Sequence, residues 1–379
     1  MNTSAFLKSS KITLTLLISL FLFSSLLSAD DQIWTNGLSQ PNDWGDGDNW
    51  QGNPADENVP KAGETATFNS GTVPSAGITL ANVPDVVNII AEASDSDVSI
   101  TLPARTYGTI TVKALNTGNI TLTLLEGTIS TQAVLIQSYG SGEAKLTINN
   151  TGSGSASITS ITMASIKIIS HEGTAKMNVN NAQLAVSGDL TFQKNNTNNP
   201  VIDNATDVWI EGDLKEEGVT STTFTIPSAA GYGLQIGGTV NQAIDLEHVI
   251  INGPLTFANT GIATLITGGE LTIGGHLTLL PSASVSAVST GRIIIGSGKI
   301  FDNSGTFQLS GQTDDRLLFA SSTIGTPFEL KNNFGAVLDF EWVAIRDCEY
   351  GSGLLGSVDF VPDDGVVNAT GNSGWPAGK

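Results

Sequence analysis

Val186-Ser-Gly-Asp-Leu190 is the first of five segments in which two apolar residues flank a central glycine, with one spacer on each side. The other four are Ile210-Glu-Gly-Asp-Leu214, Ile236-Gly-Gly-Thr-Val240, Ile251-Asn-Gly-Pro-Leu255 and Ile273-Gly-Gly-His-Leu277. Their last apolar residues are separated by 24, 26, 15 and 22 residues, so three of the four steps fall in a narrow band. A period of about 20 to 30 residues is typical of a solenoid.

The segments around this repeat carry the pattern of half-buried β-strands, in which apolar and polar residues alternate between Gly, Asn or Pro boundaries. Helical periodicity is almost absent there. Because each strand of a solenoid pairs with its equivalents one coil before and after, the sequence predicts an all-β, single-stranded parallel β-helix. The runs that carry the pattern are 98–102, 109–113, 145–149, 165–169 and 176–180.

A string of antiparallel sandwiches is the alternative fold. It predicts two-residue hairpin turns between successive strands, and only Asn252-Gly253 fits that pattern well. In the β-helix, by contrast, glycines mark corners where a Cβ would clash or where φ is positive. Uncharged Thr, Ser and Asn on the outer faces avoid stacking like charges about 4.8 Å apart on neighbouring rungs.

The composition agrees with such an architecture and excludes several classes of function. Only 14% of the 379 residues are charged, and 42 are glycine. The formal net charge is −20, which excludes binding to nucleic acid through clustered cations and disfavours anionic membrane surfaces.

Four zones follow from the distribution of residues. Residues 1–29 read as a secretory signal peptide, with Lys8 and Lys11 before an apolar stretch from Ile12 to Leu27. An uncleaved anchor is the alternative, but the stretch is short and polar for a span of about 20 residues. Residues 30–75 form a Trp-rich N-terminal cap, 76–335 the parallel β-helix, and 336–379 the C-terminal rungs and cap. Cleavage after Ala29 removes two lysines and no acids, which gives 14 − 36 = −22.

An open β-helix has two bare ends that need caps. We expect Trp34, Trp44 and Trp50 to cover the first rung together with the strand that contains Phe68. At the other end, we expect Trp342 and Trp375 to close the last rung.

The two flanks also carry a family resemblance. Trp34-Thr-Asn-Gly37, Asp48-Asn-Trp50, Val59-Pro60 and Gly63-Glu-Thr-Ala-Thr-Phe68 follow an order that resembles the N-terminal module of bacterial exported β-helix proteins related to autotransporter passengers and filamentous adhesins. The stretch from Phe340 to Trp375 resembles their terminal rungs. The resemblance implies a right-handed parallel β-helix at the cell surface and transfers no catalytic residue. The chain stops at Lys379 without a long translocator barrel, so we expect an exoprotein rather than a self-exporting autotransporter.

Two acidic segments are candidates for chemistry. Asn42, Asp43, Asp46, Asp48 and Asn49 form the densest oxygen cluster, and calcium takes six to eight such ligands. The calcium-loop spacing of EF-hands is not met, so whether Asp43, Asp46 and Asp48 bind calcium or form a solvated loop stays open.

The second acidic segment is Thr313-Asp-Asp-Arg316, where Asp314 and Asp315 are the best candidates for paired-carboxylate hydrolysis. The alternative is a corner loop in which Arg316 pairs with a neighbouring acid. We assign no catalytic, cofactor-binding or metal residue and no cofactor.

The remaining reactive side chains are predicted to be structural. Cys348 is the only cysteine, so it forms no intrachain disulfide, and we expect it to be buried and inert. The histidines, His171, His248 and His276, lack metal-ligand spacing, and we expect His248 and His276 to face solvent.

These observations predict an extracellular or cell-surface structural protein of adhesin type without catalytic activity. The alternative is an extracellular polysaccharide-acting enzyme, a lyase or glycoside hydrolase, on a pectate-lyase-like β-helix. We expect the partner to be a cell-surface or matrix polysaccharide or protein, with no nucleic acid and no stable membrane insertion after signal cleavage.

Overall fold

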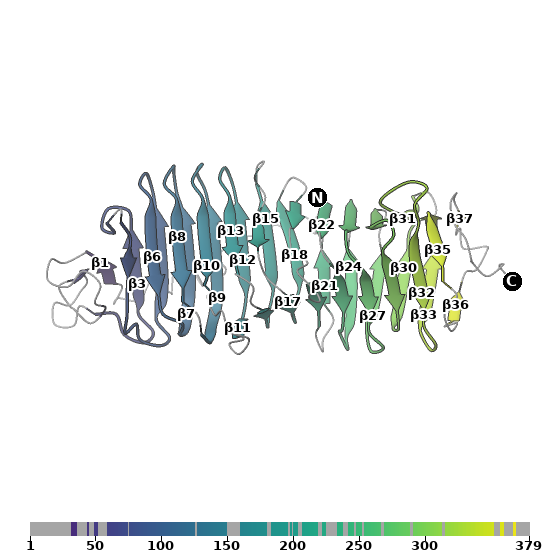
Figure 1. Cartoon of the computed structure of the whole chain (residues 1–379), viewed down its shortest axis with the longest axis horizontal. Helices are drawn as coiled ribbons and strands as arrows, with labels where there is room; N and C mark the ends of the chain where they lie inside the picture. The colour runs from purple at the N-terminus through teal and green to yellow at the C-terminus, as the bar shows by residue number, and fades with distance from the viewer. Residues whose placement is uncertain are drawn as a thin grey trace, which may run out of the picture.

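The computed structural model describes most of the chain between residues 32 and 368. The described residues are 32–35, 44, 49–51, 59–74, 76–125, 127–149, 160–179, 183–195, 198, 200–203, 207–218, 222–224, 233–237, 242–245, 248–251, 254–266, 269–288, 291–312, 315–351, 357–359 and 367–368. Within these residues the protein is all-β, with no helix, and its strands stack as a parallel β-solenoid. Figure 1 shows the coils following one another along the long axis of the molecule.

Three ladders of parallel strands form the walls of the solenoid. The first ladder runs in pairing order through β3 (Thr65–Asn69), β5 (Asn88–Ala93), β7 (Thr106–Ala114), β9 (Ile129–Ser138), β12 (Ile166–Ser170), β15 (Leu190–Lys194), β18 (Leu214–Gly218), β21 (Gln242–Asp245), β24 (Ile262–Ile266), β27 (Ser284–Val288), β30 (Thr306–Ser310), β33 (Val337–Glu341) and β36 (Ser357–Asp359).

The second ladder begins where the first part of β9 pairs with β11. It continues through β11 (Ser160–Met163), β14 (Gln183–Val186), β17 (Asp207–Ile210), β20 (Gly233–Ile236), β23 (Leu255–Phe257), β26 (Leu277–Leu279), β29 (Ile300–Asn303), β32 (Phe328–Asn332) and β35 (Cys348–Tyr350). The long strand β9 therefore serves both walls, because its first residues pair with β11 and its last residues with β12.

The third wall consists of two consecutive ladders. The first contains β4 (Ile78–Thr79), β6 (Val98–Leu102), β8 (Ile120–Leu124), β10 (Ala144–Ile148), β13 (Ala175–Asn178) and β16 (Val201–Asp203). The second contains β19 (Thr222–Phe224), β22 (His248–Ile251), β25 (Glu270–Ile273), β28 (Arg292–Ile295), β31 (Leu317–Ser321), β34 (Val343–Arg346) and β37 (Val367–Asn368). The five runs with alternating polarity in the sequence overlap strands of these walls, namely β6, β7, β10, β12 and β13.

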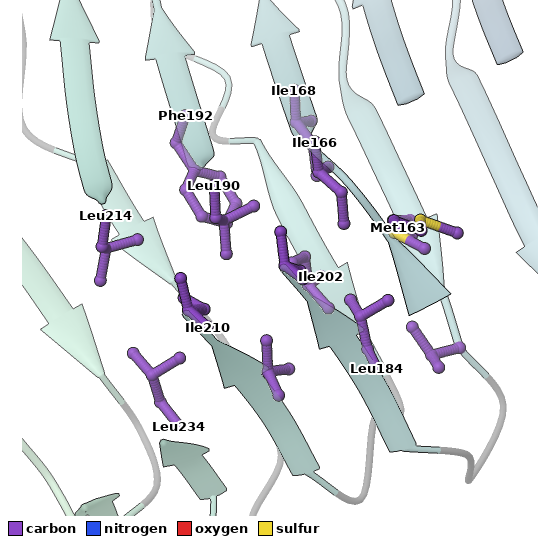
Figure 2. Close-up of a cluster of buried hydrophobic side chains, with 14 of the residues drawn as sticks. Met163, Ile166, Ile168, Leu184, Leu190, Phe192, Ile202, Ile210, Leu214 and Leu234 are labelled. Atoms are coloured by element: carbon purple, nitrogen blue, oxygen red, sulfur yellow. The ribbon is translucent and has the colours of Figure 1, made fainter. Parts of the chain in front are cut away.

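Stacking in register places apolar side chains in continuous inward columns. One column of the first ladder contains Ala66, Ile89, Ile110, Val134, Ile166, Leu190, Leu214, Ile244, Leu265, Ala287, Leu309 and Phe340, all of them buried. Figure 2 shows part of this core, where Leu190 and Leu214 lie near Ile210 and Leu234 of the second ladder. Because alternate residues of a strand point to opposite faces, the intervening residues form the outer surface.

The glycine motif occupies two different corners of the coil. Val186 and Ile210 stack at the ends of β14 and β17, and Leu190 and Leu214 stack at the starts of β15 and β18. The later motifs that begin at Ile251 and Ile273 instead join the third wall to the second, because these residues end β22 and β25. The short step of 15 residues in the repeat is therefore a change of corner.

Close approach between rungs explains the central glycine of the motif. A Cβ on Gly212 would lie 2.3 Å from the carbonyl carbon of Gly188, one rung below. Neither residue is among the described glycines with positive φ, so the corner requires the missing side chain rather than a left-handed backbone. Of the two reasons predicted for corner glycines, the clash applies here.

The N-terminal end carries the predicted aromatic cap. β1 (Gln32–Trp34) pairs in parallel with β3 and antiparallel with β2 (Trp50–Gln51), so the last strand added at this end reverses direction. Trp34, Trp44 and Trp50 are buried with their ring centroids 5.9, 6.3 and 5.6 Å from that of Phe68. The predicted packing of these three tryptophans over the Phe68 strand is confirmed.

At the other end, Trp342 is half-buried in a bend between β33 and β34 with a φ of 54°, and Trp375 lies outside the described residues. Parallel pairing continues across the composition changes near residues 76 and 336, since β3 pairs with β5 and β30 with β33. The strands β3 and β33 of the two aromatic flanks therefore belong to the same parallel stack as the strands between them.

The close approach at the corner glycines leads to a first prediction, which concerns thermal stability. Replacing Gly212 by Ala forces a Cβ against backbone that cannot move without disturbing the rung, and overpacking of this kind costs about 1–3 kcal/mol. We expect Gly212→Ala to lower the midpoint of thermal unfolding monitored by circular dichroism. Thr121→Ala, on the outer face of β8, is the matched control and should change stability by less than about 0.5 kcal/mol. Equal midpoints for Gly212→Ala and the wild type would contradict the stacking argument.

Tyr107 makes a second prediction, which concerns alkaline pH. Burial raises the pKa of its phenol, and the hydroxyl donates a hydrogen bond of 2.6 Å to the carbonyl oxygen of Pro103. The neutral phenol therefore stabilises the fold below its ordinary pKa near 10, and that contribution is lost as pH rises above about 10. Tyr107→Phe should cost about 0.5–1.5 kcal/mol at neutral pH. In urea titrations between pH 9 and 12, the variant should lose less stability than the wild type, and parallel losses would refute the assignment.

Candidate functional site

The three walls present three outer faces, and these are the candidate binding surfaces of the described chain. We name them by their most prominent side chains. The threonine face is the outer side of β4, β6, β8, β10 and β13. The charged face is the outer side of the first ladder from β5 to β18. The tryptophan face is the outer side of β14, β17, β20, β23 and β26.

The threonine face is a regular array of hydroxyl groups. One column consists of Thr79, Thr101, Thr123 and Thr147, which pair directly from rung to rung. Neighbouring rungs of a parallel sheet are about 4.8 Å apart, so the same group recurs at that interval along the rod. The column beside it contains Ser99, Thr121, Lys145 and Lys176. The described strands of this face from β4 to β13 contain no acid.

The charged face places opposite charges on nearby rungs. Lys113 of β7 lies in register with Glu92 of β5, and their Nζ and Oε1 atoms are 3.0 Å apart. Lys167 of β12 reaches Glu217 of β18 at 2.7 Å. These pairs are partly exposed, so each contributes about 0–1 kcal/mol and mainly keeps the stacked charges compatible.

Lys215, on β18 at the last rung of the charged face, binds two acids. Its Nζ lies 2.8 Å from Asp189 Oδ2 and 3.0 Å from Asp213 Oδ2. Partial burial alone would raise the pKa of the Asp189 carboxyl, but hydrogen bonds from Lys215 and from the Asp213 amide hold that pKa below its usual range. The same hydrogen bonds from Lys215 to Asp189 and Asp213 raise the pKa of the Lys215 ammonium. Asp189 and Lys215 are therefore both ionised and paired with each other at neutral pH.

The tryptophan face contains an aromatic residue, Trp209, whose outward position was missed from the sequence. Trp209 lies in β17, one residue before the buried Ile210, and is partly exposed. The signal was present, because a residue next to a buried strand position points outward. In register it lies between Ala185 of β14 and Gln235 of β20.

A further aromatic pair lies at the corner that follows the first ladder. Tyr139 is 42% exposed and stacks on His171, with ring centroids 4.7 Å apart and an angle of 18° between the planes. Asn195, one rung further on, places its Nδ2 2.8 Å from His171 Nδ1 and fixes the imidazole ring. This corner therefore presents an exposed phenol next to an imidazole whose orientation is held by a hydrogen bond.

The predicted solvent-facing position is confirmed for His276 and stays a prediction for His248. His276 is exposed, as expected, and its Nδ1 accepts a hydrogen bond of 3.0 Å from the amide of Ile300 on the next rung. It therefore stabilises the stack. His248 belongs to β22 in register with Glu270, and the position of its side chain lies outside the described structure.

Each acidic candidate falls partly outside the described residues. Asn42, Asp43, Asp46 and Asp48 are not described, whereas Asn49 is buried and its carbonyl oxygen accepts a hydrogen bond of 2.7 Å from the amide of Thr35. The calcium prediction therefore stays a prediction. In the part of the chain that the structure describes, no group of three or more His, Cys, Asp or Glu side chains forms a metal site.

Asp314 also lies outside the described residues, so the separation of the proposed carboxylate pair is undefined. Asp315 and Arg316 are both exposed. The backbone of Asp315 exchanges two hydrogen bonds with the backbone of Gln312, of 3.0 and 3.1 Å. The described half of this candidate is thus a solvent-facing loop.

Cys348 is buried at the start of β35, with no exposed surface, as the sequence predicted. Burial, followed by the nearby charge of Glu349, raises the pKa of its thiol well above the ordinary value. Because the thiolate is the reactive form, this cysteine is chemically inert in the folded protein.

The burial of Cys348 yields a third prediction. Native protein mixed with a thiol reagent such as dithionitrobenzoate at pH 8 should show almost no reaction, whereas protein in guanidinium should release one equivalent of chromophore. The difference follows from the inaccessible, neutral thiol of the folded state. Full reaction of the native protein within seconds would show that the thiol is accessible.

Comparisons with known proteins complete this description. No helix with the length and hydrophobicity of a membrane span occurs in the described part of the chain. No protein-family model, curated protein or solved structure matches the sequence or the fold of this chain.

Proposed function

We propose that this protein is a secreted or cell-surface structural β-solenoid, of adhesin type, that binds a matrix or cell-surface partner through its outer faces. One observation supports the proposal: the threonine face repeats the same kind of polar side chain from rung to rung. The threonine column from Thr79 to Thr147 is the most regular example.

A repeated surface suits a repeated partner. Successive rungs present similar groups to a partner at intervals of about 4.8 Å. A polymer lying along the rod therefore contacts several equivalent sites at once. Linked weak contacts of this kind raise overall avidity far above the affinity of any single site. Extended faces of solenoids are generally used in this way.

The expected export supports a role outside the cell. The segment 1–29 has the charged start, apolar middle and small-residue end of a secretory signal peptide. Apolar columns stabilise the fold without a disulfide, and the only thiol is buried. In each ion pair of the charged face, the lysine and the glutamate neutralise each other. The remaining acidic side chains give the surface a net negative charge that favours solubility.

A fourth prediction tests this function through localisation and retention. Expressed with a C-terminal tag in a bacterium, the full chain should reach the medium or the cell surface, with an N-terminus at Asp30 found by mass spectrometry. Leu17→Arg, which places a charge in the apolar stretch, should leave the precursor uncleaved inside the cell.

The retention half of the same test uses purified residues 30–379. We expect this protein to bind washed cells or extracted matrix and to pellet with them, while an unrelated acidic protein of similar size stays in solution. Equal distribution of the wild type and Leu17→Arg, or no retention on cells or matrix, would contradict the proposed function.

A further inference from the structure

Trp209 is placed differently from the tryptophans of the N-terminal cap. Trp34, Trp44 and Trp50 are buried in the core, whereas the Trp209 indole lies on the outer side of β17 and is partly exposed. Exposed indoles are concentrated at binding surfaces, because the ring combines a large apolar area with one polar N–H group.

A glycine on the next rung makes room for the indole. A Cβ on Gly237 would lie only 2.2 Å from Cζ2 and 2.5 Å from Cη2 of Trp209, so the six-membered ring rests directly over the Gly237 backbone. The Trp209 Nε1 donates a hydrogen bond of 3.4 Å to Glu211 Oε1, which restrains the orientation of the ring. The indole is therefore held against the surface in a defined position.

Polar groups flank this platform. Gln235 lies directly beside Trp209 in register on β20, and the exposed Glu211 carboxylate lies at its Nε1 edge. A pyranose ring presents C–H groups on its face and hydroxyl groups at its rim. The C–H face packs on the electron-rich face of an indole, while a carboxamide donates hydrogen bonds to the rim hydroxyls or accepts them, and a carboxylate accepts them.

The charge of the tryptophan face selects among polysaccharides. None of its strands, β14, β17, β20, β23 and β26, contains a Lys or Arg, and the Glu211 carboxylate adds negative charge beside the Trp209 indole. An acidic polysaccharide would be repelled here, because no cation compensates its carboxylates or sulfates. A neutral polysaccharide carries no such penalty.

We propose that the tryptophan face binds a neutral polysaccharide, with the Trp209 indole as the platform for one sugar ring and Gln235 and Glu211 as its hydrogen-bonding flanks. The inference rests on the proposed adhesive function and names its partner class.

The test measures binding of residues 30–379 by affinity electrophoresis in gels that contain laminarin, xyloglucan or glucomannan as neutral probes, and alginate or pectate as acidic ones. We expect retardation by at least one neutral polysaccharide and by neither acidic one. Trp209→Ala should weaken that binding about 10-fold or more, because a central tryptophan typically contributes more than 1.4 kcal/mol.

Two further variants separate the platform from general stability. Gly237→Ala keeps the indole but fills the space beneath it, so it should displace the ring and weaken binding in the same gels. Tyr139→Ala removes an exposed aromatic residue from a different corner and should bind like the wild type. Thermal melts of all three variants verify that they are folded, and Trp209→Leu, which keeps apolar volume, replaces Trp209→Ala if the latter is unfolded.

Several outcomes would overturn the inference. They are wild-type affinity in the Trp209 variants, preference for alginate or pectate, loss of binding in Tyr139→Ala alone, and no retardation by any neutral polysaccharide. If the Trp209 variants still pellet with cells or matrix like the wild type, the platform is refuted while the adhesive function stands. If the wild type itself neither leaves the cell nor pellets with matrix, the proposed function fails independently.

Discussion

In-register stacking of each rung on the next is the constraint on which the rest of this structure depends. Because equivalent residues lie about 4.8 Å apart along the rod, every inward position becomes a column, and one incompatible residue disturbs two neighbours. The column from Ala66 to Phe340 stays apolar throughout for this reason. The same constraint acts at the corners, where Gly212 approaches Gly188 so closely that no side chain fits between them.

Stacking also determines where polar groups enter the interior. The buried Asn303 donates from its Nδ2 to Asn332 Oδ1 at 2.7 Å and to the carbonyl oxygen of Val337 at 3.1 Å. Ser138 similarly donates to the carbonyl oxygen of Gly142 at 2.7 Å. Gly142 lies in the corner between β9 and β10, where the ladder is interrupted and backbone groups need other partners, and Val337 begins β33 directly after a corner. Buried polar side chains therefore extend the ladder around the turn and join successive walls.

On the outer faces, the same stacking places similar residues side by side on successive rungs, so that the residue type of a column determines the character of the whole face. Opposite charges on nearby rungs, such as Lys113 and Glu92, make a charged face compatible with stacking. Threonines in a column make a neutral face with a constant repeat. Trp209 interrupts this regularity, and only the glycine beneath its indole allows it. The proposed adhesive role uses the regular faces for extended contact and the interruption for recognition of a sugar ring.

The sequence by itself determined the strands and the direction of their side chains, because alternation with period two is a local property. Residues 98–102 illustrate this, since their buried and exposed positions follow the pattern directly. The repeat also indicated the solenoid, and the Trp-rich N-terminal flank indicated the aromatic cap around Phe68. Only the tertiary structure decided which corner each glycine motif occupies and which side chains meet across rungs. The motifs at 186–190 and 251–255 look alike, yet they join different walls. Gly237 lies under Trp209 because β20 pairs with β17 in a register that sets Gln235 beside Trp209, and that register has no local signature in the sequence.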